Sequence, residues 1–210
     1  MTDYNTLVAA KSTAGSIKNF SNNSSLPVSV IVAETEAWIY RRLRTPEMLT
    51  STTGTITTSA TNVAVPARLV QPRHLLITGT DVGKITAKSF EVVRDAWTYD
   101  GSGVRGAGKP TIYYCDFTSL WFDQMANKAY PINLLYYQQL APLAATNSTN
   151  VLTDKYPTLL RYELQAMAAS WMKDDAEKDY WEKKCLLEIE QANIEAGAFD
   201  EVIEEAMEIT

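Results

Sequence analysis

The sequence has few of the residues on which enzymatic and metal chemistry most often depends. It contains one histidine, His74, and two cysteines, Cys115 and Cys185, among 210 residues. One imidazole excludes a multi-histidine metal site and leaves a single possible imidazole base. The cysteines lie far apart in different kinds of segment, so we expect two reduced thiols. No G-x-S-x-G, C-x-x-C or H-E-x-x-H motif occurs. We therefore predict no catalytic residues, no metal site and no cofactor.

Long apolar runs are also missing. No run approaches the length needed to cross a bilayer. The first residues, MTDYNTLVAAKSTAGS, lack the basic lead and apolar block of a secretory signal, so we expect no membrane partner. The hydrophobic content of 46% and the charged content of 21% are ordinary for a folded protein. The length allows one large domain or two small ones.

Basic residues are missing from the last part of the chain. No Lys or Arg follows Lys184, whereas eight acidic residues lie from Glu188 to Glu208. Since the whole chain has 19 basic and 25 acidic residues, the part up to Lys184 has 19 basic and 17 acidic residues. The acidic run is typical of a solvated helix end, and composition alone favours this interpretation over a functional one. It is also compatible with a tail that docks on a basic partner or repels DNA.

The first part of the chain has the apolar spacing of helices. Ser25 or a near neighbour is a candidate cap, and Pro27 lies in the first turn of a helix that continues to Arg44. Residues Val28 to Leu43 place their large apolar side chains on one broad face. A weaker helix is predicted from Tyr4 to Ala14.

Helical spacing returns after residue 150. Pro157 starts a helix through TLLRYELQAMAASWM, with Asp154 or Tyr156 as its cap. Asp174 is a candidate cap for a further helix that we expect to stop at Gly197. The apolar face predicted for this last helix consists of residues about seven apart and their neighbours, namely Tyr180, Trp181, Cys185, Leu187 and Ile194.

The middle of the chain is rich in Thr, Val, Ile and Tyr and has frequent turn residues, which is typical of short strands. The segment SFEVVRDAW is predicted as one short helix within it. The predicted fold is therefore α+β: a bundle of about four helices formed by both chain ends, with an antiparallel β-rich insertion between the second and third helices. The predicted parts are 1–48 with 150–197 as the helical bundle, 49–149 as the β-rich insertion, and 198–210 as an acidic tail.

A glycine-rich loop, DGSGVRGAGKPT from Asp100 to Thr111, matches two nucleotide-binding patterns. Both patterns need a helix after the loop, because the helix N-terminus supplies the amides that hold phosphate. Here Lys109 is followed by Pro110 and by TIYYC, which is strand-like. The loop is therefore predicted to be an exposed hairpin tip. Its cations, Arg105 and Lys109, are candidate contacts to a phosphate backbone or to an acidic surface of a partner.

Aromatic residues occur in adjacent pairs, which would place rings on both faces of the predicted strands. Both faces would then need cover, which favours either a two-layer sandwich or strands covered by another protein chain. An internal core accounts for about half of the rings at best, so the surplus indicates assembly. The pairs are Tyr113 and Tyr114, Trp121 and Phe122, and Tyr136 and Tyr137.

Three segments together resemble the head-to-tail adaptor, or connector, proteins of short-tailed phages. They are IVAETEAWIYRRLRTPEM (31–48), VPARLVQPRHLLITG (65–79) and the stretch from TNVLTDKYPTLLRYEL to EIEQAN (149–193). Arg68 departs from the family pattern, which commonly has an acidic residue there. The residues that match the family most closely are Ala33, Glu34, Arg42, Leu43, Arg44, Asn150, Leu152, Tyr156, Pro157, Leu160, Tyr162, Leu164, Ala168, Asp174, Asp175 and Trp181.

The resemblance implies a structural virion protein and not an enzyme. Such proteins form a ring of about twelve copies below the portal. The ring extends the DNA channel and provides a platform for the tail nozzle. The implied partners are further copies of the chain, the portal protein, the nozzle protein, and genomic DNA that passes without being read. The implied location is the head–tail interface of the virion, after synthesis in the host cytoplasm.

In that family the C-terminal segment commonly reaches the portal, whereas the β-rich part with its basic tip would face the tail or neighbouring subunits. The candidate portal-binding residues here are Glu195, Phe199, Asp200, Val202, Ile203, Met207 and Ile209.

Two other classes stay open from the sequence. One is a different virion component, such as a tail-tube or fibre protein. The other is a nucleotide-binding enzyme that uses the Gly101–Lys109 loop, which the residues after Lys109 disfavour.

Overall fold

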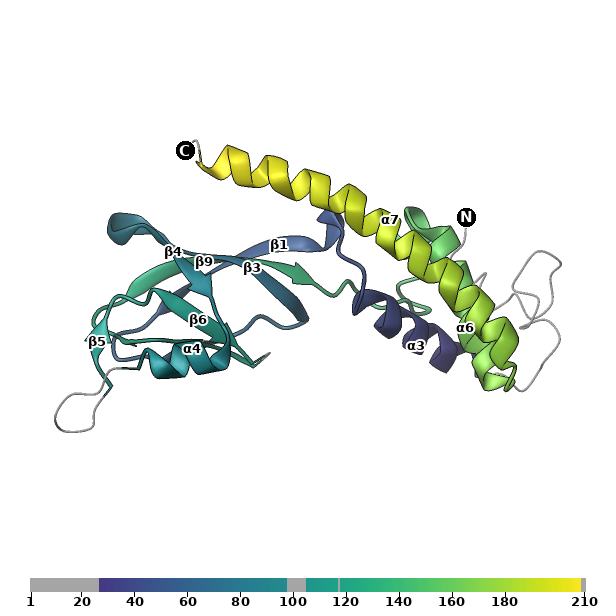
Figure 1. The fold of residues 1–210 in the computed structure, drawn as a ribbon, viewed down its shortest axis with the longest axis horizontal. Coiled ribbons are helices and arrows are strands. Elements are labelled where there is room, and N and C mark those ends of the chain that lie inside the picture. The colour runs from purple at the N-terminus through teal and green to yellow at the C-terminus, as the bar shows by residue number, and fades with distance from the viewer. Residues whose placement is uncertain (1–26, 98–104, 117, 209–210) are drawn as a thin grey trace. The chain divides into compact units, whose positions relative to one another are not determined.

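The computed structural model describes residues 27–97, 105–116 and 118–208, with side chains described as far as Gly197. The chain divides into two compact units, residues 1–48 with 140–210 and residues 49–139 (Figure 1). We call them the helical unit and the β unit. The helix predicted from Tyr4 to Ala14 and the candidate cap Ser25 lie outside the described residues.

In the described part of the helical unit there are three long helices and two short ones. Helix α6 lies between α3 and α7, packing against both (Figure 1). The interior is aliphatic, with Ile31, Ile39, Leu160 and Leu164 inaccessible to solvent, so burial of these side chains stabilises the unit. The elements are α3 (Val28–Tyr40), the 3-10 turn η1 (Pro46–Met48), α5 (Val151–Asp154), α6 (Pro157–Trp171) and α7 (Asp175–Glu208).

The starts of α6 and α7 were predicted correctly, whereas the predicted bounds of α3 and the predicted end of α7 were not. Helix α3 begins at Val28 with Pro27 as its N-cap and ends at Tyr40, not at Arg44. Helix α6 begins at Pro157 with Tyr156 as its N-cap, and Asp174 accepts a hydrogen bond from the Glu177 amide ahead of α7 (3.1 Å). The expected stop at Gly197 is wrong, because α7 continues for 34 residues to Glu208. Gly197 lacks the positive φ of a helix-ending glycine, and an added Cβ there would meet no atom within 4 Å.

The β unit contains a seven-stranded, nearly closed sheet in the order β1-β9-β3-β4-β6-β7-β2. All neighbouring pairs are antiparallel except β4 with β6, which is parallel. Strands β5 (Ala107–Gly108) and β8 (Met125–Ala126) form a separate parallel pair. The seven strands are β1 (Leu49–Ile56), β2 (Asn62–Ala64), β3 (Leu69–Ile77), β4 (Gly83–Ala87), β6 (Ile112–Cys115), β7 (Ser119–Phe122) and β9 (Tyr130–Gln138).

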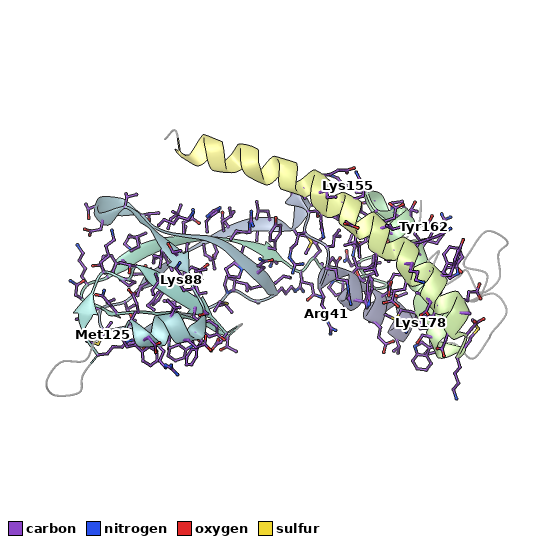
Figure 2. The ribbon with its side chains drawn as sticks, in the orientation of Figure 1. Arg41, Lys88, Met125, Lys155, Tyr162 and Lys178 are labelled. Carbon is purple, nitrogen blue, oxygen red and sulfur yellow. The ribbon has the colours of Figure 1, made fainter. Side chains whose placement is uncertain are left out.

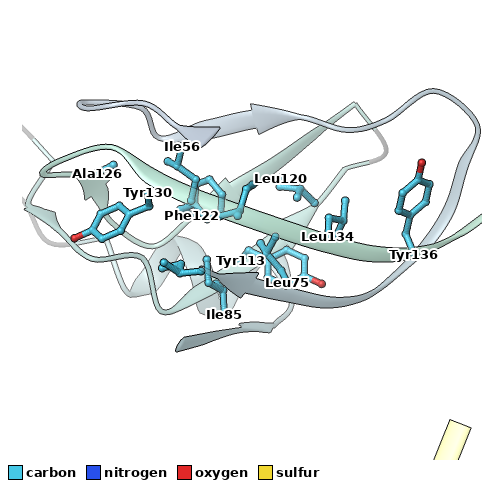
Figure 3. Packing of buried hydrophobic residues seen from close by; sticks show 12 residues of the cluster. Ile56, Leu75, Ile85, Tyr113, Leu120, Phe122, Ala126, Tyr130, Leu134 and Tyr136 are labelled. Carbon is cyan, nitrogen blue, oxygen red and sulfur yellow. The ribbon is translucent and has the colours of Figure 1, made fainter. Parts of the chain in front are cut away.

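The β unit has a hydrophobic core of its own (Figure 3). Its centre is formed by Tyr113, Phe122 and Leu75, each at most 1% exposed. These residues come from three different strands, so the strands depend on one another for burial. Helix α4 (Phe90–Asp95) is the short helix predicted for SFEVVRDAW, and the ring of Phe90 packs edge-on against Tyr114 with centroids 5.5 Å apart.

The predicted fold class is wrong. The protein has mixed α and β structure with a large sheet, and it is not a four-helix bundle carrying a small β insertion. Within the described residues, the fourth helix of the helical unit is α5, a single turn of four residues. The error arose because strands of two to nine residues, separated by turns, look minor in a sequence even when they share one sheet and one core.

The predicted surplus of exposed aromatic rings is also not observed. Tyr113, Phe122, Tyr136 and Tyr137 are buried, at 5% exposure or less. Trp121 is half-buried, and its indole N–H donates to Asp116 (2.7 Å). The β unit therefore covers these rings itself, and any assembly surface has to be located by other features.

Candidate assembly surfaces

The outward face of α7 carries most of the exposed large apolar side chains of the helical unit. Leu187 is 67% exposed, Ile194 62%, and Leu186 41%. The exposed side chains between and beside them are largely acidic. The predicted apolar face of α7 is thus partly wrong, because the residues that face the interior are Cys185, Ile189, Ala192 and Ala196. The exposed acidic residues are Glu188, Glu190 and Glu195.

A groove of about 530 Å³ runs between this face and the end of α3. Asn193 fixes the two sides to each other: its amide donates to the Arg42 carbonyl (2.9 Å), and its Oδ1 accepts from the Arg44 backbone N–H (2.7 Å). The Arg42 guanidinium lies over the Trp38 ring at 3.9 Å. These contacts predefine the groove. Its lining residues are Arg42, Leu186, Ile189, Glu190, Asn193 and Ile194.

Toward the other end of α7, Lys184 lies among aromatic rings. Tyr162 stacks on Trp181 with centroids 5.6 Å apart, and Tyr180 meets Trp181 edge-on at 4.9 Å. The Lys184 ammonium lies 4.6 Å from the Tyr180 ring centroid. At the start of α6, Lys155 pairs with Glu47 at 2.5 Å (Figure 2). Both lysines thus have partners within the helical unit.

Two glutamates are buried inside the helical unit. Glu36 on α3 is 2% exposed and accepts hydrogen bonds from the Leu143 backbone N–H and from Asn150 Nδ2, both at 2.8 Å. Burial raises the pKa of Glu36 and also that of Tyr40 beside it. Asn150 in turn caps α5 in a reciprocal capping box with Thr153. This network fixes the segment through which the chain enters α5.

Glu163 on α6 is the second buried glutamate, at 1% exposure. Desolvation raises its pKa to about 8, with the nearby Glu182 charge adding to the effect. The adjacent Cys185 thiol donates to the Leu159 carbonyl (3.8 Å), and burial raises its pKa as well. Among the described residues, the Glu163 Oε2 atom has no hydrogen-bond partner. The protonated form is therefore favoured near neutral pH.

The turn between β3 and β4 presents an apolar side chain among lysines. Val82 is 72% exposed. Lys109 Nζ donates to the Val82 carbonyl (3.4 Å), and Lys128 pairs with Asp81. Lys84, two residues after Val82, is exposed. Sequence analysis missed this cluster because its members come from three separate segments; only the isolated apolar Val82 beside turn residues gave a local signal.

The two predicted loop cations do not share a binding partner. Arg105 lies with its guanidinium 4.1 Å from the Trp97 ring centroid, whereas Lys109 contacts the β3–β4 turn. Residues 101–104 of the Gly101–Lys109 loop lie outside the described residues. Strand β6, and not a helix, follows Lys109, so the loop does not lead into a helix N-terminus that could bind phosphate.

The predicted portal-binding residues are spread along the end of α7. Glu195 is exposed and accepts a hydrogen bond from Gln191 (2.8 Å). Phe199, Asp200, Val202, Ile203 and Met207 belong to the helix by their backbone, but their side chains lie outside the described set, as does all of Ile209. Within the part of the chain with described side chains, no three His, Cys, Asp or Glu residues are grouped to hold a metal ion. None of the helices searched there is long and apolar enough to span a bilayer.

These features define a protein whose distinctive surfaces carry exposed apolar side chains on two folded units. Comparison with known proteins gives the family: the model for the SU10 adaptor protein matches residues 6–204, and the chain belongs to this family. The resemblance to phage head-to-tail adaptors is thereby confirmed. The protein is a structural adaptor component of a phage particle. No curated protein sequence matches the chain.

Proposed function

We propose that the protein forms a ring below the portal that extends the DNA channel and provides the platform for the tail nozzle. The proposal is carried by the family match over residues 6–204. It is supported by exposed apolar faces on both units, since patches of this kind on folded proteins mark interaction sites. The chain would be made in the host cytoplasm and end in the virion at the head–tail interface.

Ring formation requires heterologous contacts, in which one face of each copy meets a different face of the next. The helical unit and the β unit each offer an exposed face, so one chain supplies both halves of such a contact. We propose about twelve copies, with residues 1–48 and 150–197 of the helical unit as the ring wall. The β-rich part, residues 49–149, would face the nozzle.

The acidic segment 198–210 is proposed to dock on the portal. The backbone of α7 continues to Glu208, which would carry this segment well beyond Ala196, the last buried residue among those with described side chains. Acidic side chains near the channel would repel the duplex, so that DNA passes without lasting phosphate contacts and without sequence reading.

Electron microscopy of the protein mixed with the portal of the same phage tests the proposal. The protein alone should be monomeric by light scattering and should form a ring on the portal. A protein that neither binds the portal nor forms a ring would refute the proposal, and a thread-like trimer would instead indicate a fibre. Calorimetric titration with a nucleotide and Mg²⁺ tests the enzyme alternative, in which stoichiometric binding would be lost on Lys109→Ala.

A further inference from the structure

Two exposed features on different units of the chain each combine apolar side chains with charged ones. One is the groove on α7, which is open, largely apolar and edged by Glu190 and Arg42. The other is the β3–β4 turn, which is convex and carries an apolar tip among lysines. A pair of faces that match each other on one molecule is what a head-to-tail contact between copies requires.

The groove offers an apolar surface that the helical unit leaves uncovered. Ile194 and Leu186, at 62% and 41% exposure, line it, with Ile189 beneath. Glu190 and Arg42 provide its polar edges. Because Asn193 bonds α7 to the backbone at Arg42 and Arg44, the groove is preformed and its occupant would not have to open it.

The turn offers the most exposed large apolar side chain among the described residues, Val82 at 72%. Lys109 is hydrogen-bonded to the carbonyl of Val82 itself, Lys128 pairs with the neighbouring Asp81, and Lys84 is exposed two residues on. Three lysines thus surround one aspartate and an apolar tip, leaving the turn with excess positive charge.

The net charges of the two units also differ in sign: the β unit is net positive and the helical unit is net negative. Residues 49–139 contain eight basic and six acidic residues, whereas the rest of the chain contains 11 basic and 19 acidic residues. Opposite charges steer two surfaces together and suppress contacts between like units. A helical unit therefore meets the β unit of another copy more favourably than it meets a second helical unit.

We propose that the groove on α7 of one copy receives the β3–β4 turn of the next copy, with Val82 against Leu186 and Ile194 and with Lys84 near Glu190. The inference rests on the proposed ring and names its subunit contact. The occupant is a second copy of this chain, because the chain itself carries a turn with an exposed apolar tip and excess positive charge, and its helical unit is net negative.

Disulfide trapping between two different chains tests the contact directly. One chain carries Val82→Cys and the other Ile194→Cys, both in a Cys115→Ser background; Cys185 is buried and stays. Under mild oxidation on the portal, the mixture should yield linked dimers at about tenfold the level of either chain alone. Pairing Ile194→Cys with Val92→Cys, an exposed site on α4, is the matched control. Equal yields from both mixtures, or none from either, would overturn the proposal.

Charge reversal gives a second measurement that does not depend on cysteine reactivity. Glu190→Lys or Lys84→Glu alone should weaken ring formation on the portal roughly two- to five-fold, and the double variant should restore most of it. Lys88 is also exposed on the β unit, so Lys88→Glu is the control. Combining it with Glu190→Lys should not restore ring formation. Additive losses in the double variant would contradict the contact.

The proposed function and this contact can fail separately. If wild-type protein forms no ring on the portal, the proposed function fails and the contact loses its basis. If the ring forms but Ile194→Glu assembles as well as wild type, the contact is wrong while the function stands. Circular dichroism confirms folding of each variant, and Leu186→Cys or Leu186→Glu, in the same groove, replaces any Ile194 variant that does not fold.

Discussion

The carboxylate of Glu36 accepts a hydrogen bond from the backbone amide of Leu143 at 2.8 Å, across 107 residues of sequence. Its other oxygen accepts from Asn150 Nδ2, also at 2.8 Å. The whole β unit lies between the two partners in the chain. A buried acid on the first described helix thereby fixes the segment through which the chain enters α5. No local sequence pattern predicts these long-range hydrogen bonds.

Replacing Glu36 by Ala should therefore lower the free energy of unfolding of the helical unit by about 2 kcal/mol or more, because the buried Leu143 amide would lose its acceptor. Glu36→Gln keeps one acceptor oxygen and should cost less. Urea unfolding followed by circular dichroism measures both. Glu34→Ala on the exposed face of α3 is the control, with an expected change within about 0.5 kcal/mol. Equal losses at positions 34 and 36 would contradict a role for the buried network.

Glu163 should make stability depend on pH. Its pKa rises from 4.5 to about 8 on folding, so the folded protein holds a proton that the unfolded chain releases. The contribution of this proton to the free energy of unfolding is fully present below pH 4.5 and is lost as pH rises through 8. The free energy of unfolding then falls by at most about 1.4 kcal/mol per pH unit. Glu163→Gln, which stays neutral, should match wild type near pH 4.5 and exceed it by about 2–4 kcal/mol at pH 8.5.

Thermal unfolding of both proteins between pH 5 and 9 gives this difference directly. Glu188→Gln makes the same chemical change at an exposed site, so it controls for the loss of one negative charge. A difference between Glu163→Gln and wild type that stayed constant with pH would show that Glu163 is ionised in the folded protein.

Gly197→Ala distinguishes a helix that continues from one that stops. In the middle of α7, with space around the added methyl group, alanine should raise the free energy of unfolding of the surrounding helix by about 0.5–1 kcal/mol. If the helix ended there with glycine in the left-handed region, alanine would be strained and helix content would fall. Far-UV circular dichroism and the unfolding midpoint report the sign.

The sequence predicted local features well where a single residue type decides the backbone. Pro157 and Asp174 mark the starts of α6 and α7 because a missing N–H or a capping oxygen acts within one turn. Gly197 misled, since glycine ends a helix only when the chain adopts a positive φ there, and further helical turns follow it instead.

Features that depend on distant partners were not predictable in this way. On α7, the spacing of Tyr180, Leu187 and Ile194 fits an apolar face as well as that of Cys185 and Ile189, and only packing against α6 selects the second. The sheet was underestimated for the same reason, because its core forms only when strands far apart in the chain pair. The cluster around Val82 likewise joins three segments, and no local pattern could show it.

Deletion of residues 198–210 should abolish portal binding while the fold is retained. Among the side chains described, the last buried one on α7 is Ala196, so the deletion removes no described core contact, and the unfolding midpoint should fall by only a few degrees. Immobilised portal and biolayer interferometry would measure the binding. An unchanged affinity would refute the docking role of the tail.

The same assay can separate charge from apolar contact in that segment. Neutralising Asp200, Glu201, Glu204 and Glu205 to their amides keeps the apolar side chains and the helix length. If attraction to a basic portal surface dominates, this variant should bind several-fold more weakly, and the loss should shrink at high salt because screening already removes that term. If Phe199 and Ile203 provide most of the affinity, alanine at those two positions should cause the larger loss, and that loss should be insensitive to salt.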